Sequence, residues 1–127
     1  MRSSPLVLIV DDQVDLRLLI RLTFSDMGYT VQEASDGAAA LAACALEVPD
    51  VVLLDVMMPG IDGHEVCRRL RADARCDRTL IVMLTAADQS SQRPRGDAAQ
   101  ADLYVTKPFS PAGLLQLVTS TLRSRHD

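Results

Sequence analysis

Polar residues of a few chemical types follow the apolar runs of this sequence, and together they could bind and transfer a phosphoryl group. Two carboxylates follow the first run, a third follows a later run, and a hydroxyl and an ammonium follow two more. These residues are Asp11, Asp12, Asp55, Thr85 and Lys107. Carboxylates bind hard divalent cations, hydroxyl and ammonium groups bind phosphate oxygens, and an aspartate can attack phosphorus to form an acyl phosphate.

Asp55 is the residue best placed to act as the nucleophile, since a carboxylate is already an anion and needs no general base. Asp12 and Asp55 can supply ligands to Mg²⁺, while Asp11 would orient a bound water or add charge. Met57 lies in the segment DVMMPGIDG, whose glycines and proline suit a tight loop that brings its carbonyl oxygen near the cation. Lys107 is the only lysine among 13 basic residues, which indicates a special use for a flexible ammonium.

Short apolar runs alternate with segments of helical period, which is typical of βαβ units and a parallel sheet. The runs at 6–10, 51–54 and 80–84 are apolar throughout, as strands covered on both faces must be. The segments 30–34 and 103–106 mix polar and apolar residues and fit edge strands. Because parallel crossovers are right-handed, we expect an α/β fold of the (βα)5 type, a doubly wound, flavodoxin-like sheet of five strands in the order 2-1-3-4-5. The first and third strands then end at the topological switch point, where such sheets bind ligands.

Periodic apolar residues and capping residues mark the helices. In a helix over about 14–27, the residues expected to face the core are Leu16, Leu19, Ile20, Phe24 and Met27. Asp62 and Ser110 are the expected N-caps of two later helices. The segment Gln89–Gln100 contains a proline, a glycine and almost no large apolar residue, so a fourth helix there should be short or start late.

Size and composition fit one soluble globular domain, since the chain has 127 residues, of which 48% are hydrophobic and 24% charged. The net charge of -4 argues against direct binding to nucleic acid or to an anionic membrane. The sequence has no signal peptide and no apolar stretch of membrane-spanning length. The spacing of Cys44, Cys67 and Cys76 fits buried thiols in a reducing compartment. We therefore expect a cytoplasmic protein.

Four motifs, at matching spacing, resemble those of response-regulator receiver domains of two-component signalling, the CheY-like family, over essentially the whole chain. The motifs are LIVDD, LLDVMMPGIDG, MLTA and YVTKPF. The resemblance implies a phosphoacceptor signalling switch and not an ordinary enzyme, although the domain assists its own phosphorylation and its slow dephosphorylation. It also implies a histidine kinase or a histidine phosphotransfer protein as the donor, and a downstream protein partner that the sequence does not identify.

The resemblance assigns roles to individual residues. The implied roles are phosphoacceptor for Asp55, binding of Mg²⁺ (or Mn²⁺) for Asp11, Asp12, Asp55 and the Met57 backbone carbonyl, and phosphoryl contact for Thr85 and Lys107. Tyr104 matches the aromatic residue that switches together with the threonine. The peptide between Lys107 and Pro108 is the candidate cis bond, a form that is otherwise uncommon even before proline.

Two departures from the family pattern affect these expectations. Gln100 stands where a glycine is common, which makes a left-handed backbone there more costly. Met57 and Ala87 follow the phosphoacceptor and the threonine by two residues, and neither has a side chain that could orient an attacking water. We therefore expect an acyl phosphate that hydrolyses slowly.

The outer face of the helix at 14–27 carries Val14, Leu18 and Leu22. Exposed single leucines are ordinary in soluble proteins, and this interpretation carries about the same weight as a docking surface for a helical phosphodonor.

Two other functions stay open from the sequence. One is a receiver fold that docks partners without ever being phosphorylated, against which the complete set of polar residues argues. The other is a phosphatase that resembles haloacid dehalogenases, against which DDQVD argues, since the DxD pattern with a nearby threonine is missing. The chain ends soon after the last predicted helix, so we expect a single receiver domain over 1–127 with no effector domain, or else a fragment of a longer protein.

Overall fold

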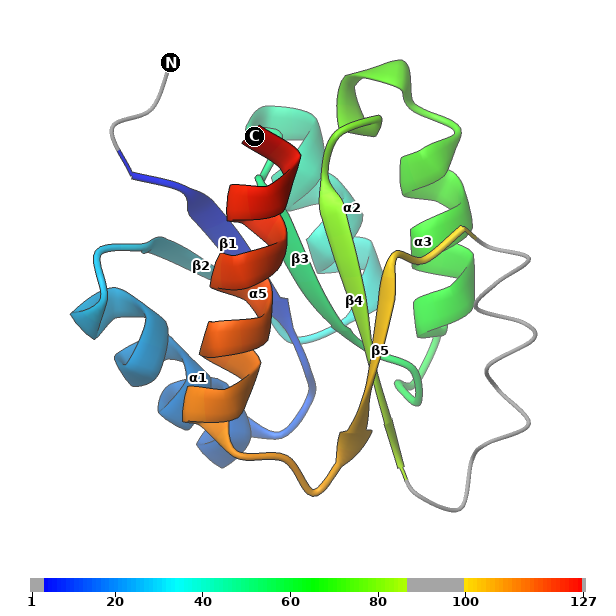
Figure 1. Cartoon of the computed structure of the whole chain (residues 1–127). Helices are drawn as coiled ribbons and strands as arrows, with labels where there is room; N and C mark the ends of the chain where they lie inside the picture. The colour runs from blue at the N-terminus through cyan, green and yellow to red at the C-terminus, as the bar shows by residue number, and fades with distance from the viewer. Residues whose placement is uncertain (1–3, 87–99, 127) are drawn as a thin grey trace.

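Short apolar segments form one parallel, five-stranded sheet in the computed structural model, which describes residues 4–86 and 100–126. The strands are β1 (Leu6–Val10), β2 (Thr30–Ala34), β3 (Val51–Asp55), β4 (Leu80–Ala86) and β5 (Leu103–Lys107). They lie in the order β2-β1-β3-β4-β5, and every neighbouring pair is parallel. The predicted order is confirmed, and the strands run toward the bottom of Figure 1.

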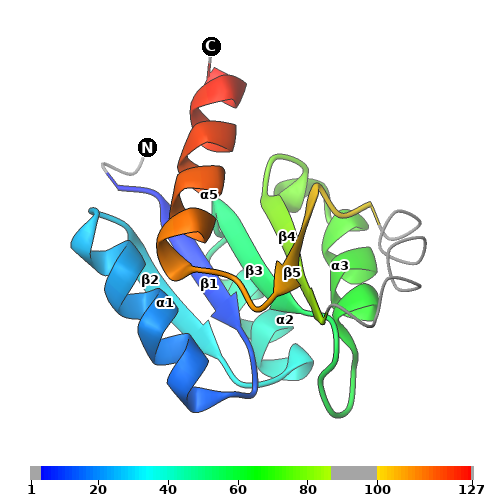
Figure 2. The same cartoon turned by 60° about the horizontal axis from the view of Figure 1, so that its bottom comes forward.

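Helices cover both faces of the sheet. The first face carries α1 (Val14–Asp26) and α5 (Pro111–His126), and the second carries α2 (Gly37–Leu46), α3 (Gly63–Arg71) and the short 3-10 helix η1 (Ala74–Cys76). Figure 2 shows the sheet between these two layers. This is the doubly wound, flavodoxin-like α/β fold expected from the sequence. Apart from Gln100, the segment predicted as a weak fourth helix lies outside the described residues.

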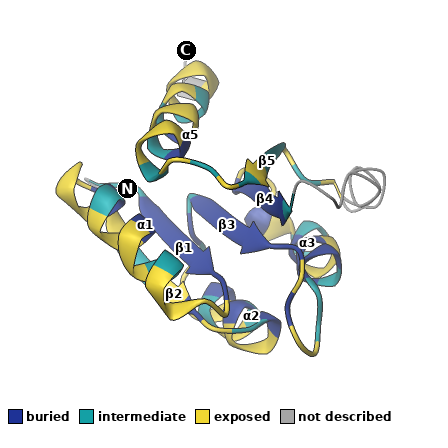
Figure 3. Ribbon diagram, turned by 90° about the horizontal axis from the view of Figure 1, so that it is seen from below, coloured by how far each residue is buried: buried dark blue, intermediate teal, exposed yellow. Residues whose placement is uncertain are grey.

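Two apolar clusters, one on each face, hold the helices to the sheet. The strands β1 and β3 are buried along their whole length, because helices cover both of their faces. Ile20 and Phe24 of α1 meet Leu114 and Val118 of α5 in the first cluster. The second cluster includes all three cysteines, which are buried free thiols as predicted. Figure 3 shows the buried strands between helices whose outer surfaces are exposed.

The helix α1 buries a narrower stripe than predicted. Ile20 and Phe24 are fully buried, and Leu16 packs against them. Leu19 and Met27 were expected in the same stripe, but both are exposed. Leu19 is rotated by about 100° from Ile20 around the helix axis. Met27 follows the last helical residue, at φ -102° and ψ 18°, and so leaves the helical periodicity.

Side-chain caps begin the helices as expected. The Asp62 carboxylate accepts a hydrogen bond from the backbone N–H of Glu65 at 2.9 Å, and the Ser110 hydroxyl accepts one from Gly113 at 2.8 Å. These bonds satisfy backbone donors that have no partner inside the helix. Both predicted caps are confirmed. The Glu65 side chain pairs with arginines further along α3.

A carboxylate at the amino-terminal edge of the sheet ties several elements together. Asp102, just before β5, accepts hydrogen bonds from the guanidinium groups of Arg71 and Arg125 and from the backbone N–H of Ile81. Arg71 also donates to the carbonyl of Gln100 at 2.9 Å. Gln100 has φ 70°, so it adopts the left-handed conformation that costs a residue other than glycine more. The start of β5 is therefore anchored to α3, β4 and α5.

The loop after β3 returns close to the strand end at Gly63. A Cβ atom at this position would lie 2.5 Å from the Asp55 carbonyl oxygen and 2.9 Å from the Val56 Cα. The Gly63 N–H also donates to the Val56 carbonyl at 3.0 Å. Because the neighbouring atoms belong to the backbone, no side chain can turn away to make room. The start of α3 is thus packed directly against the end of β3.

We expect Gly63→Ala to lower the free energy of unfolding by about 3 kcal/mol, since the added methyl group must displace the backbone at the end of β3. Gly113→Ala is the matched control, because this exposed helical position offers only a contact of 3.3 Å to the Ser110 hydroxyl. Urea denaturation followed by circular dichroism measures both variants. Equal stability of the two proteins would contradict the close packing at Gly63.

Candidate functional site

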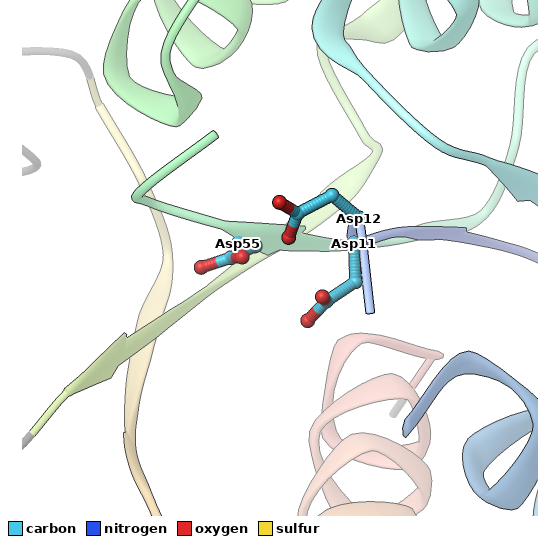
Figure 4. Close-up of side chains that lie close together, drawn as sticks. All are labelled: Asp11, Asp12 and Asp55. Atoms are coloured by element: carbon cyan, nitrogen blue, oxygen red, sulfur yellow. The ribbon is translucent and has the colours of Figure 1, made fainter. Parts of the chain in front are cut away.

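The site lies at the carboxyl ends of the strands, where β1 and β3 are neighbours. Asp11 and Asp12 directly follow β1, and Asp55 is the last residue of β3. Carboxylate oxygens of the three residues all lie within 4.8 Å of one another. Figure 4 shows the side chains gathered beside the two strand ends. The sheet order therefore brings together carboxylates that are more than 40 residues apart in the sequence, counting from Asp12 to Asp55.

Lys107, the last residue of β5, reaches two of these carboxylates. Its Nζ lies 3.3 Å from Asp11 Oδ2 and 3.5 Å from Asp55 Oδ1. The lysine side chain is 23% exposed, whereas both carboxylates are buried. One ammonium thus offsets part of the negative charge and leaves the third carboxylate, Asp12, at the solvent-exposed mouth of the pocket.

The pKa of Asp55 is raised from 3.8 to about 6. Burial is the largest cause, and the charge of Asp11 is the second. Lys107 and the backbone N–H of Met57, which donates to Asp55 Oδ1 at 3.2 Å, partly oppose this rise. Ionising Asp55 therefore costs free energy unless more positive charge enters the pocket.

The donor set of this pocket fits a hard divalent cation. Mg²⁺ and Mn²⁺ prefer oxygen ligands, and a site with three carboxylates and one ammonium keeps excess negative charge. Asp11, Asp12 and Asp55 would hold such an ion. The acidic cluster is compatible with metal binding, and a bound cation would favour the ionised form of Asp55.

The other predicted site residues lie at the same edge or beside it. Thr85 is buried near the end of β4, next to Leu84, which pairs in register with Asp55. Tyr104 of β5 is half-buried against the core cluster on the α2 and α3 side of the sheet. The peptide between Lys107 and Pro108 is cis, as predicted. The roles of Thr85 and Tyr104 stay predictions.

Two further expectations concern the rim of the pocket. The Met57 side chain is exposed, and the contribution of its carbonyl oxygen to a metal site stays a prediction. Val14, Leu18 and Leu22 are all exposed on α1, which begins two residues after Asp12. Ala87, expected to affect the rate of hydrolysis, lies outside the described residues.

The sequence did not reveal the residues that hold Asp11 in place. The backbone N–H of Gln13 donates to Asp11 Oδ1 at 2.8 Å, and the guanidinium of Arg17 donates to the Asp11 carbonyl at 2.7 Å. Arg17 belongs to α1, and its contact with the pocket was not predicted. The other partner of Arg17 is Glu33 of β2, which is distant in the sequence, so no local pattern could have shown the contact between Arg17 and Glu33.

Comparison with known proteins agrees with this geometry. The family model named response regulator receiver domain matches residues 7–119. The chain belongs to this family. The resemblance seen in the four motifs is thereby confirmed, and membership of the family implies a role in phosphoacceptor signalling. Receiver domains are signalling switches that take a phosphoryl group from histidine kinases.

Several relatives and one solved structure resemble this receiver domain closely. The response regulator MprA of Mycobacterium ulcerans is 45% identical over 117 residues, which cover 92% of this chain and 50% of that protein. MprA of Mycobacterium leprae is 44% identical over the same length and coverage. The chemotaxis response regulator CheY4 of Vibrio cholerae has a TM-score of 0.87 and 34% identity, covering 93% of this chain and 98% of that one. The receiver domain thus spans about half the length of the curated relatives it matches.

We expect Asp55→Asn to stabilise the metal-free receiver domain at about pH 8, by up to ~3 kcal/mol for a pKa raised by roughly two units. A raised pKa in the folded state means that stability is lost as the pH rises from about 3.8 to about 6, because the unfolded chain releases this proton in that range while the folded protein still holds it. Below about 3.8 the carboxyl is protonated in both states, so the advantage of the variant should disappear toward low pH.

Urea denaturation in EDTA at several pH values measures this difference. Asp12→Asn, which removes an exposed carboxylate, is the control and should change the stability less. Addition of Mg²⁺ should stabilise the wild type more than Asp55→Asn, since binding to the folded state raises its stability. A variant that gains nothing at high pH would show that Asp55 ionises without cost.

Proposed function

We propose that this receiver domain is a magnesium-dependent phosphoacceptor switch in which Asp55 takes a phosphoryl group from a histidine kinase or a histidine phosphotransfer protein. The convergence of Lys107, Asp11 and Asp12 on Asp55 is the observation that carries this proposal. A merely structural aspartate at a strand end has no need of two more carboxylates and a lysine beside it.

The chemistry follows from the groups in the pocket. A carboxylate oxygen of Asp55 forms a bond to phosphorus while the bond from phosphorus to the donor histidine nitrogen breaks, and the electron pair returns to that nitrogen. Lys107 is placed to neutralise phosphoryl oxygens, and the Thr85 hydroxyl is the second donor from the chain. Asp11, Asp12, Asp55 and the Met57 carbonyl would hold Mg²⁺, which would supply positive charge to the phosphoryl oxygens when bound.

The output is a change in packing that follows the new charge. Thr85 on β4 and Tyr104 on the adjacent strand β5 are the proposed switch pair. A phosphoryl group on Asp55 would draw the threonine toward it, and the tyrosine ring would turn into the space released. A local charge that biases a two-state packing arrangement is a general switching device. A downstream protein would recognise the altered face around β5 and α5.

The donor protein is proposed to dock on α1. Val14, Leu18 and Leu22 are spaced four residues apart, so they lie on one face of the helix, and all three are exposed. The helix begins beside Asp12, which places this face next to the mouth of the acidic pocket. An apolar stripe at this spacing suits a helix of the partner.

With a net charge of -4, the domain would act through proteins and not through direct contact with nucleic acid or membrane. Within the described ranges, every helix is too short or too polar to cross a membrane.

Of the rival functions, permanent docking without phosphorylation leaves the ion pairs of Lys107 unexplained. A phosphatase like the haloacid dehalogenases disagrees with the family to which the chain belongs. The phosphoacceptor switch accounts for both observations.

Incubation with acetyl phosphate and Mg²⁺ should add one phosphoryl group to the wild type and none to Asp55→Asn, as read by intact mass. Omission of Mg²⁺ should slow the reaction of the wild type strongly, because the phosphoryl oxygens lose a source of neutralisation. Lys107→Met should also react more slowly. An adduct of equal yield on Asp55→Asn would move the phosphorylation site elsewhere.

We expect Leu18→Ser combined with Leu22→Ser to slow phosphotransfer from the cognate donor by at least about tenfold, since a factor of ten is only about 1.4 kcal/mol and each leucine contributes roughly 1.5–3 kcal/mol when fully covered. The rate with acetyl phosphate should stay unchanged, because the pocket is intact. Leu46→Ser is the control, as this exposed leucine lies at the end of α2 on the other face of the sheet. Unchanged transfer from the donor protein would remove α1 as its docking surface.

A further inference from the structure

Asp11 is held at four separate points. Its backbone N–H donates to the Ala34 carbonyl at 3.2 Å, its Oδ1 accepts from the Gln13 N–H at 2.8 Å, and its Oδ2 lies 3.3 Å from Lys107 Nζ. The fourth point is its carbonyl oxygen, which accepts a hydrogen bond from Arg17 Nη1 at 2.7 Å. Of the four, only the bond from Arg17 comes from a side chain that stands outside the pocket.

Arg17 joins three elements through one guanidinium. Besides its bond to Asp11, its Nε donates to Glu33 Oε1 of β2 at 3.1 Å. The Arg17 side chain is only 15% exposed, whereas Arg21, which contacts the other oxygen of Glu33 at 3.0 Å, is 55% exposed. Glu33 pairs in register with Ile9 of β1, so this carboxylate is itself fixed beside the strand that leads into the pocket. Arg17 thus fastens the loop after β1 to both α1 and β2.

The position of this loop decides where two of the three pocket carboxylates lie. Asp11 and Asp12 are consecutive, and Asp12 is exposed, so the backbone at Asp11 sets the direction of both side chains. Residues that fix the ligands of a metal site strengthen binding, because the ligands lose less freedom when the ion arrives. The same guanidinium brings positive charge toward the pocket, and charge alone would weaken the binding of a cation. The two effects predict opposite results when Arg17 is replaced.

We propose that Arg17 is a positioning residue for the acidic pocket, which holds the Asp11–Asp12 backbone in the conformation that binds a divalent cation. Glu33, which also pairs with Arg21, offsets part of the charge of Arg17, and the direct bond from Arg17 to the Asp11 carbonyl makes positioning outweigh repulsion. This inference rests on the proposed function, since it concerns the metal that the phosphoacceptor reaction uses.

The test measures Mn²⁺ binding to the full chain from the electron paramagnetic resonance signal of the free ion, since the chain contains no tryptophan to report binding. We expect Arg17→Met to raise the Mn²⁺ dissociation constant by about tenfold, the size found when partners of metal ligands are removed. Arg17→Lys keeps the charge and one donor, and should raise it by about threefold. Arg21→Met loses a contact to the same Glu33 without touching Asp11, and should change it by less than about twofold.

Each outcome decides the inference. If Arg17→Met binds Mn²⁺ as tightly as the wild type or more tightly, then Arg17 either has no effect on the site or weakens it through its charge. Either result would overturn the positioning role. Thermal melts without metal establish that each variant is folded. If Arg17→Met fails to fold, the decision rests on Arg17→Lys, for which wild-type affinity would overturn the proposal. If the wild type binds no Mn²⁺, the proposed metal-dependent function itself is overturned. If wild type and variants bind Mn²⁺ equally, only the positioning role of Arg17 is overturned.

Discussion

The repulsion among three carboxylates at the ends of two adjacent strands is the constraint on which this structure depends. A single ammonium, brought by β5, relieves only part of it. Burial and, after it, the charge of Asp11 raise the pKa of Asp55, and the remaining negative charge makes the pocket compatible with a divalent cation. The proposed response to phosphorylation would therefore depend on electrostatic repulsion that the fold maintains among these carboxylates.

The fold maintains this repulsion because the carboxylates lie at the ends of its most buried strands. The strands β1 and β3 are covered on both faces, and the backbone at Gly63 packs against the end of β3. Carboxylates that are held so firmly cannot move apart to escape one another. The helix α1, by contrast, buries only a narrow stripe and leaves several apolar residues on its surface. Rigidity at the pocket and an open apolar surface next to it suit the proposed transfer of a phosphoryl group from another protein.

The parts of this structure that follow from local patterns were predictable from the sequence. The strand order and the meeting of the polar residues come from apolar periodicity and the handedness of crossovers. The predicted burial of Leu19 and Met27 was wrong, because the phase of a short amphipathic helix is uncertain at its flanks and ends. The contact of Arg17 with Glu33 depends on two elements packing side by side, and no sequence pattern records it. The raised pKa of Asp55 likewise could not be predicted, because it depends on how deeply the carboxyl group is buried in the folded structure.

A practical consequence follows from the fact that Lys107 is the only lysine of the chain. An amine-selective reagent has one side-chain target in this sequence, the Nζ that contacts Asp11 and Asp55. Because these carboxylates hold the ammonium in place, the speed of its acylation reports directly on whether the pocket is filled. Lys107 is therefore a natural labelling site at the acidic pocket. Footprinting by mass spectrometry could follow the occupancy of the pocket without any engineered residue.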